Sequence, residues 1–214
     1  MREILAGTVF GILLVGAGGC GPTGDRAPRA DAIEEARAAL ERYRDVTVAM
    51  ADGYVRDPLN TCETPAHRGQ PAELGDMGIH YLHPTLLGVG PDQTRFDASG
   101  VHTDFRRPGV LIYEPHPGDE LVLTGVANIV SASAWESAGN QGPPSFGGAD
   151  FTFMPDDPAQ LVAAHYDMHL WLFRENPNGI TAAYNPAVSC EHHVNEMPML
   201  HPMTDPATHD DHTP

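Results

Sequence analysis

Apolar residues recur at steps of three and four between residues 31 and 54, which is the spacing of one helix face. The recurring positions are Ile33, Ala36, Leu40, Tyr43, Thr47, Met50 and Tyr54. Asp31 followed by Glu34 resembles a capping box, and Gly53 is a residue type at which helices commonly end. The pattern predicts one amphipathic helix over residues 31–52 that packs its apolar face on a core.

From residue 75 onward, short apolar segments are separated by Gly and Pro, which is typical of strands and loops. Strands are expected at residues 78–82, 110–114 and 120–131, the last divided near Gly125. Residues 115–119 indicate a hairpin turn, and residues 139–148 a loop. Pro158 favours a brief helical turn, a strand is expected from about Asp167, and residues 176–179 predict a chain reversal.

Together these elements predict a single α+β domain over residues 31–190. Its N-terminal helix packs on a curved, mainly antiparallel β-sheet, with a small barrel as the closed form of that sheet. At 41% hydrophobic and 19% charged residues, the chain can bury a core of this kind.

The first 20 residues have the features of an export signal: Arg2, an apolar run over residues 4–15, and small residues up to Cys20. The run is too short to span a membrane as a helix. Residues 17–20 (AGGC) resemble the lipobox of bacterial lipoproteins, which usually has Leu where this chain has Ala17. The resemblance implies that Cys20 is lipidated, with palmitate among its acyl groups, and anchors the mature chain to a membrane. Plain secretion and an uncleaved anchor are the alternatives.

A lipid anchor at Cys20 makes residues 21–30 a flexible tether and places the domain in the bacterial cell envelope. Gly21 in place of Asp is compatible with the outer membrane in a host that has two membranes. Cys62 and Cys190 are then an even pair in an oxidising compartment, and we expect them to form a disulfide. Two buried thiols are the alternative.

The charge balance restricts the partners of the chain. All 12 basic residues are Arg, and they face 29 acidic residues, for a net charge of -17. Nucleic acid and anionic lipid surfaces are bound through clustered Lys and Arg, so we expect no nucleic-acid partner. The 12 His residues are as numerous as the Arg residues, and His is the commonest metal ligand.

Five short sequence motifs lie in the C-terminal two thirds of the chain: MGIHY at 77–81, LIYEP at 111–115, HLWLF at 169–173, NPNG at 176–179 and NPAVSC at 185–190. In order and spacing they resemble an uncharacterised family of exported bacterial proteins over roughly residues 30–190. The resemblance implies a common fold and site and names no reaction. It also implies a Glu near Asn128 and a His near Phe153, and this chain has neither.

His80, Glu114 and His169 are candidate metal ligands on three separate predicted strands. Imidazole and carboxylate together suit Zn, Cu, Fe or Mn. The alternative is structural: His80 bonded to backbone, Glu114 paired with an Arg, and His169 packed beside the following Trp. His83 points to the opposite strand face from His80, and His165 lies roughly 13 Å along a strand from His169, so neither is expected to join the site.

The segment from residue 191 to residue 214 is rich in His, Met, acids and Pro, and we expect a mobile tail. Thioether and imidazole ligands favour copper and also accept zinc. The candidate accessory ligands are His192, His193, Met197, Met199, His201 and Met203. An acidic solubilising tail is the alternative.

The sequence contains no phosphate-binding loop, zinc-finger Cys spacing, HExxH or GxSxG motif. The leading hypothesis is a membrane-tethered, extracytoplasmic lipoprotein that binds or handles a transition metal, Cu or Zn, without catalysis. One alternative is a metal-dependent enzyme, in which the same His/Glu/His site leaves a coordination position open for water. Another is a small-molecule-binding or structural envelope protein without metal.

Overall fold

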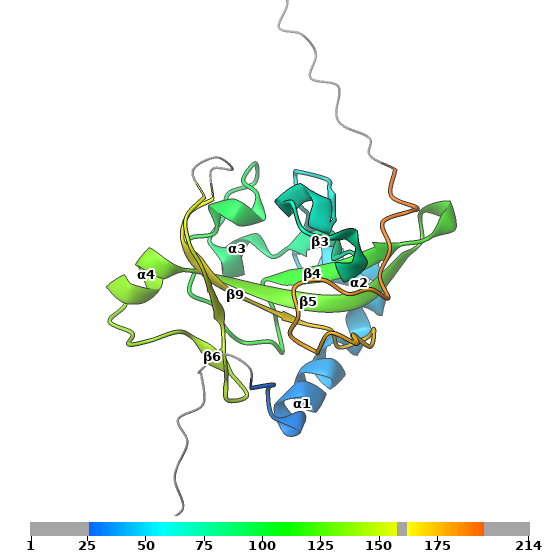
Figure 1. Cartoon of the computed structure of the whole chain (residues 1–214). Coiled ribbons are helices and arrows are strands. Elements are labelled where there is room, and N and C mark those ends of the chain that lie inside the picture. The colour runs from blue at the N-terminus through cyan, green and yellow to red at the C-terminus, as the bar shows by residue number, and fades with distance from the viewer. Residues whose placement is uncertain (1–25, 158–161, 195–214) are drawn as a thin grey trace, which may run out of the picture.

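An open antiparallel sheet forms the centre of the chain in the computed structural model, which describes residues 26–157 and 162–194 (Figure 1). Its strands lie in the order β1-β3-β4-β5-β9-β8, and β2 also pairs with β3. Their bounds are β1 Val55–Arg56, β2 Cys62–Glu63, β3 Gly78–Leu82, β4 Val110–Pro115, β5 Leu121–Ser131, β8 Thr152–Met154 and β9 His165–Leu170. The strands β1 and β8 end the order without pairing to each other, so the sheet is not closed into a barrel. The predicted α+β class is confirmed.

The predicted N-terminal helix is broken into three pieces: α1 (Ala30–Leu40), the 3-10 helix η1 (Glu41–Arg44) and α2 (Val46–Ala51). The break lies at Asp45, whose backbone is extended and whose carboxylate accepts a hydrogen bond from the Thr47 amide at 2.9 Å. An Asp in this role begins a new helix instead of continuing the old one. The expected end at Gly53 is confirmed by its left-handed φ of 97°.

Short elements connect the strands. The other α-helices are α3 (Pro84–Leu87) and α4 (Ala132–Ser137). The 3-10 helices are η2 (Pro65–Arg68), η3 (Ala72–Leu74), η4 (Arg95–Asp97) and η5 (Pro117–Asp119). The two-stranded ribbon β6 (Ser145–Phe146) and β7 (Ala149–Asp150) lies inside the predicted loop at residues 139–148 and just beyond it.

The hairpin predicted around residues 115–119 joins β4 to β5 through η5. The division expected near Gly125 is a bulge in a continuous strand, because Ile112 pairs with Gly125 whereas Tyr113 pairs with Leu123. A Cβ at Gly125 would lie 3.1 Å from the Trp171 ring, so the close passage of the chain after β9 favours glycine here.

Alternation along the strands gives the sheet two different faces. One face carries Tyr81, Leu111, Tyr113 and Val126 and packs under α1 in the main hydrophobic core. The other face carries a smaller cluster that includes Leu82, Val110, Ile112 and Ala127 and packs against Leu87 of α3. The smaller cluster covers only part of its face, and the remainder of that face is open to the cavity described below.

The C-terminal segment after β9 returns across the domain to β2, where the predicted disulfide between Cys62 and Cys190 is present with a Cα–Cα distance of 5.7 Å. The Asp76 carboxylate accepts a hydrogen bond from the Cys190 amide at 2.7 Å, and the Asn185 amide donates to the Asp76 carbonyl at 3.1 Å. The first residues of the predicted tail contact the domain, since His193 Nε2 lies 2.9 Å from the Asn60 carbonyl oxygen.

Several predictions concern residues outside the described part: the signal peptide, Cys20, the helical turn at Pro158, and the tail ligands Met197, Met199, His201 and Met203. Across residues 26–157 and 162–194, the helices are too short and too polar for any of them to cross a membrane.

Candidate functional site

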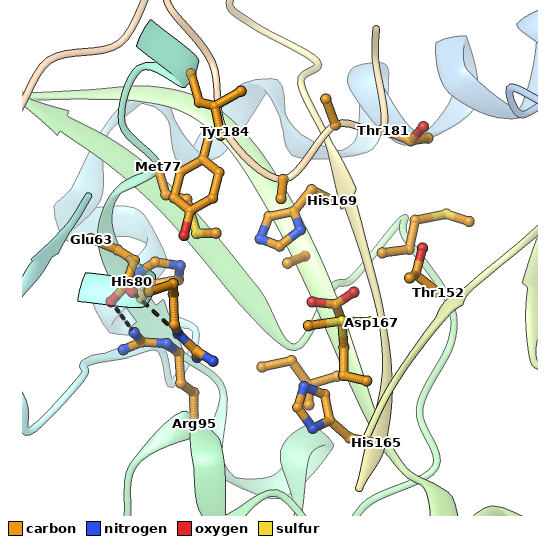
Figure 2. Close-up of a pocket in the computed structure, with 18 of the residues that line it drawn as sticks. Glu63, Met77, His80, Arg95, Thr152, His165, Asp167, His169, Thr181 and Tyr184 are labelled. Atoms are coloured by element: carbon orange, nitrogen blue, oxygen red, sulfur yellow. Dashed lines mark hydrogen bonds and ion pairs between the residues drawn. The ribbon is translucent and has the colours of Figure 1, made fainter. Parts of the chain in front are cut away.

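A cavity of about 650 Å³ opens on the face of the sheet that α1 leaves uncovered (Figure 2). One wall carries Met77, His80 and Tyr184, together with charged residues described below. The opposite wall comes from β8 and β9, and the floor includes Ala127 and Ile129 of β5. The cavity therefore draws on segments from the beginning, middle and end of the described chain.

Three polar side chains of β9 line the second wall because they alternate along the strand. His165, Asp167 and His169 are spaced by two residues, so all three project from the same face. The register agrees, since His169 pairs with Ala127 and Asp167 pairs with Ile129. Figure 2 shows the three side chains one above another along the strand.

His80 and His169 are buried, and neither ring makes a hydrogen bond to a described residue. They are 3% and 7% exposed, and Nδ1 of His80 is a buried polar atom without a partner. Desolvation by burial lowers the pKa of His80 well below its ordinary value, and the nearby Arg95 and His169 lower it further. Desolvation also lowers the pKa of His169, although the charge of Asp167 opposes that shift. Both rings are therefore uncharged at neutral pH, and each has one nitrogen that donates a hydrogen bond and one that accepts.

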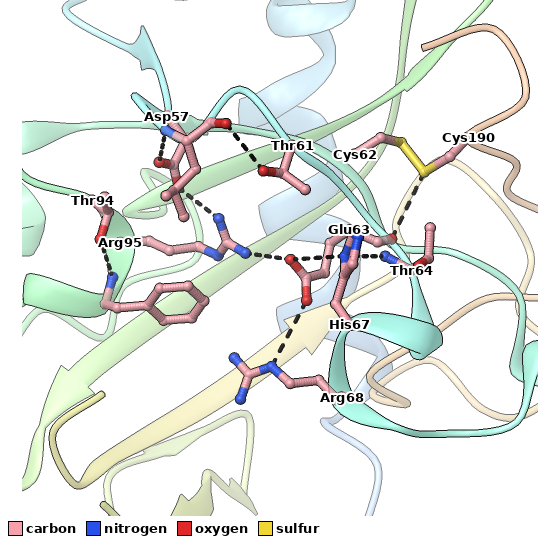
Figure 3. A network of polar contacts seen from close by, with 12 residues as sticks. Asp57, Thr61, Cys62, Glu63, Thr64, His67, Arg68, Thr94, Arg95 and Cys190 are labelled. Atoms are coloured by element: carbon pink, nitrogen blue, oxygen red, sulfur yellow. Dashed lines mark hydrogen bonds and ion pairs between the residues drawn. A yellow bond between two sulfur atoms is a disulfide. The ribbon is translucent and has the colours of Figure 1, made fainter. Parts of the chain in front are cut away.

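Figure 3 shows a buried ion network, and Figure 2 places two of its members, Glu63 and Arg95, beside His80. The Arg95 guanidinium donates to the Asp57 carboxylate at 2.7 Å and to the Glu63 carboxylate at 2.6 Å. Arg68 lies 3.8 Å from Glu63, and the Arg95 guanidinium also stacks over the Phe96 ring at 4.3 Å. These contacts balance two cations against two carboxylates, so the network holds the wall in place without net charge.

Tyr184 closes the cavity from the C-terminal segment, and Figure 2 shows its hydroxyl pointing inward. Burial raises the pKa of this phenol, and the charge of Glu63 raises it further, so the hydroxyl stays protonated. The Asn176 side-chain amide donates to the Tyr184 carbonyl at 2.9 Å and fixes the segment.

The structure brings His80 and His169 to one cavity but not Glu114, which lies outside the cavity wall. The Glu114 carboxylate accepts hydrogen bonds from Arg174 and, at 3.0 Å, from the Ser189 amide. Along β5, Glu114 pairs with Val122 whereas His169 pairs with Ala127, five positions away, which is about 17 Å along a strand. The alternative in which Glu114 meets an Arg is confirmed.

The described residues contain no cluster of three His, Cys, Asp or Glu side chains close enough to hold a metal ion. His83 lies away from the cavity, where its Nε2 accepts a hydrogen bond from Arg107 at 2.9 Å and its ring meets Tyr54 edge-on. His192 is exposed. The imidazoles predicted as ligands are thus divided between the cavity and the surface.

The positions at which the family resemblance implies further ligands have other roles in this chain. Asn128 Oδ1 accepts a hydrogen bond from the Gly109 amide at 2.6 Å. Phe153 is 52% exposed and meets the Tyr166 ring edge-on at the β8 edge. Neither side chain supplies a metal ligand.

Sequence reasoning missed His165 and Asp167 as parts of the site. The signal was present, because residues at 165, 167 and 169 share one strand face. It also missed Glu63, Arg95 and Tyr184, which come from a two-residue strand, a 3-10 helix and a loop and carry no periodic pattern.

The arrangement is a concave, largely apolar space with a few convergent polar groups, which suits binding of a small molecule. The neutral rings can exchange hydrogen bonds with a ligand, and the buried ion network holds one wall. Comparisons of the chain with protein-family models, with curated proteins and with solved structures give no match.

Proposed function

We propose that this protein is an extracytoplasmic binding protein that holds a small organic molecule in the cavity between His80 and His169. The observation that carries the proposal is a cavity of about 650 Å³ with two buried imidazoles that make no hydrogen bond to described residues. Ligand sites commonly occupy about 300 to 1,000 Å³ and contain a few polar groups in a mainly apolar lining.

The positions of the two imidazoles favour an organic molecule over a single ion. His80 lies on β3 and His169 on β9, three strand spacings apart in the sheet, which is roughly 14 Å. Strand side chains stand nearly perpendicular to the sheet, so the two rings face the cavity from different walls. A shared metal ion with bonds near 2 Å requires ligand nitrogens within about 4 Å of each other. A molecule of several atoms contacts both rings without that requirement.

Native mass spectrometry of mature protein purified without an affinity tag tests the proposal. We expect a bound organic molecule that is released on denaturation. We also expect a lower bound fraction in Ala127→Phe, which fills the cavity floor, and an unchanged fraction in Ala187→Phe, an exposed position of the C-terminal segment. Protein that is free of ligand and binds no member of a fragment library would overturn the proposal.

Retention of a transition metal, Cu or Zn, is the second candidate function. It is favoured by the neutral state of His80 and by the thioether of Met77 on the same wall, since imidazole and thioether together suit copper. Metal analysis of the same untagged protein separates the two functions. A stoichiometric metal that is lost in a His80→Phe variant supports this candidate and counts against the first.

We further propose that the domain acts at a membrane surface, tethered through a lipid on Cys20. The lipobox-like residues 17–20 support this proposal. Metabolic labelling with a palmitate analogue is expected to mark the wild type and not Cys20→Ser. A Cys20→Ser variant that is labelled and sediments with membranes as the wild type does would contradict the tether.

A further inference from the structure

We infer that the cavity selects an organic cation with N–H groups, such as an ammonium on an apolar body, and that Asp167 is its counter-ion. The inference rests on the proposed small-molecule function and names the class of ligand.

Two of the cationic side chains that line the cavity, Arg68 and Arg95, are already paired with carboxylates. Arg95 is buried between Asp57 and Glu63 at 2.7 and 2.6 Å, and Arg68 lies 3.8 Å from Glu63. An anionic ligand would have to compete with these carboxylates for the same guanidinium groups. The remaining cation of the lining, Arg26, is exposed to solvent, where a charge pair is weak.

The Asp167 carboxylate, by contrast, has no paired cation among the described residues. Its half-buried carboxylate lines the cavity and makes neither an ion pair nor a hydrogen bond with a described residue. His169, two positions along the same strand face, is 7% exposed and is likewise without a hydrogen bond in the described chain. An ammonium group that meets both donates a charge-assisted hydrogen bond to the carboxylate and a second hydrogen bond to the acceptor nitrogen of the neutral imidazole.

The full set of charges around the cavity points the same way. The acidic side chains of the lining are Glu63, Asp150, Asp157 and Asp167, and the basic ones are Arg26, Arg68 and Arg95. Buried Asp57 adds one more carboxylate behind Arg95. The four acidic side chains of the lining, with Asp57 behind them, outnumber the three Arg residues, so a cation is the ligand charge that the lining favours.

The rest of the cavity sets the shape of the ligand. Ala127, Ile129, Met77 and Met154 supply apolar contacts beside the two polar walls. His80 faces the ligand from the wall opposite Asp167, so a polar atom at the far end of the ligand meets this second imidazole. The ligand class is an amphipathic amine with one ammonium end.

Isothermal titration calorimetry with matched probes tests the inference: 3-phenylpropylamine, 3-phenylpropanol and 3-phenylpropanoate on the full mature protein at neutral pH. These probes have the same apolar body and differ in the charge of one end. We expect the amine to bind about tenfold or more tightly than the alcohol, and the acid to bind most weakly. Asp167→Asn should reduce amine affinity about tenfold and leave alcohol affinity unchanged. Asp92→Asn, an exposed position away from the cavity, is the matched control and should change neither.

The outcomes separate the ligand class from the proposed function. If the alcohol or the acid binds as tightly as the amine, or if Asp167→Asn leaves amine binding unchanged, the cavity binds small molecules but the cation inference fails. If none of the three probes binds the wild type, the result counts against the inference and the proposed function together. If Asp167→Asn weakens amine and alcohol equally, Asp167 shapes the cavity and is not a counter-ion.

Discussion

Replacement of Arg95 by Met is expected to remove a large part of the stability of the domain. The Arg95 side chain is 5% exposed and bonds Asp57 and Glu63, which are 3% and 7% exposed. Arg95→Met leaves the Asp57 carboxylate buried without its cation and leaves the Glu63 carboxylate with Arg68 alone, at 3.8 Å. Removal of one partner from a buried ion pair costs about 3 to 5 kcal/mol, a large fraction of the roughly 5 to 15 kcal/mol that stabilises a typical domain.

Urea unfolding followed by circular dichroism measures this loss as a change in the free energy of unfolding. Arg106→Met is the matched control, because Arg106 also pairs with an Asp, at 2.9 Å, but is 61% exposed. We expect no measurable change for it. Adding Asp57→Asn and Glu63→Gln to Arg95→Met should restore most of the lost stability, since no buried charge is then left unpaired. A loss below about 1 kcal/mol for Arg95→Met alone would refute the reasoning.

The remaining predictions concern the disulfide, a buried histidine and a crowded glycine. Replacing Cys62 and Cys190 by Ala should lower the free energy of unfolding by about 4 to 5 kcal/mol in the chain-entropy model, because the bond closes a loop of 128 residues. Two titratable thiols in unfolded, unreduced wild-type protein would contradict the presence of the disulfide. Because burial, with the charge of Arg95, lowers the pKa of His80, this histidine takes up its proton in the unfolded chain first as pH falls. The stability that the neutral ring contributes is fully present above about pH 6.5 and is lost as the pH falls below that value. In urea titrations from about pH 7 to 5, the free energy of unfolding should therefore fall less steeply in His80→Phe than in the wild type. At Gly75, with φ of 77°, a Cβ would lie 2.2 Å from a backbone oxygen, whereas at Gly69, with φ of 62°, it meets nothing within 4 Å. Gly75→Ala should therefore lower the melting temperature of the protein much more than Gly69→Ala does. In Gly69→Ala the left-handed backbone is the one source of strain and costs about 1 kcal/mol. Equal losses of melting temperature in the two variants would contradict the crowding at Gly75.

The long, regular parts of the fold follow from local patterns in the sequence. Strands β3, β4 and β5 were predictable because each is a short apolar run that follows a Gly or Pro residue closely. The break at Asp45 was not, because its capping role depends on an extended backbone that the apolar spacing does not record. The open sheet also follows from no local signal, since closure depends on whether two distant edges meet.

The site shows the same division between local and long-range information. His80 and His169 were identifiable as polar residues inside apolar strands, and both line the cavity. The sequence could not decide between the two roles considered for Glu114, metal ligand or partner of an Arg, because the register between β4 and β5 and the position of Arg174 decide it. Glu63 and Arg95 are 32 residues apart and meet only in three dimensions.

The disulfide bears on the order in which the walls of the cavity form. Strands β3 to β5 are neighbours in sequence and pair through nearby contacts, whereas the wall that carries Tyr184 is held by a bond between Cys62 and Cys190, 128 residues apart. A chain delivered N-terminus first thus builds its sheet early and its last wall late. Under the proposed function, a ligand can be held between these walls only after the chain up to Cys190 has joined the domain.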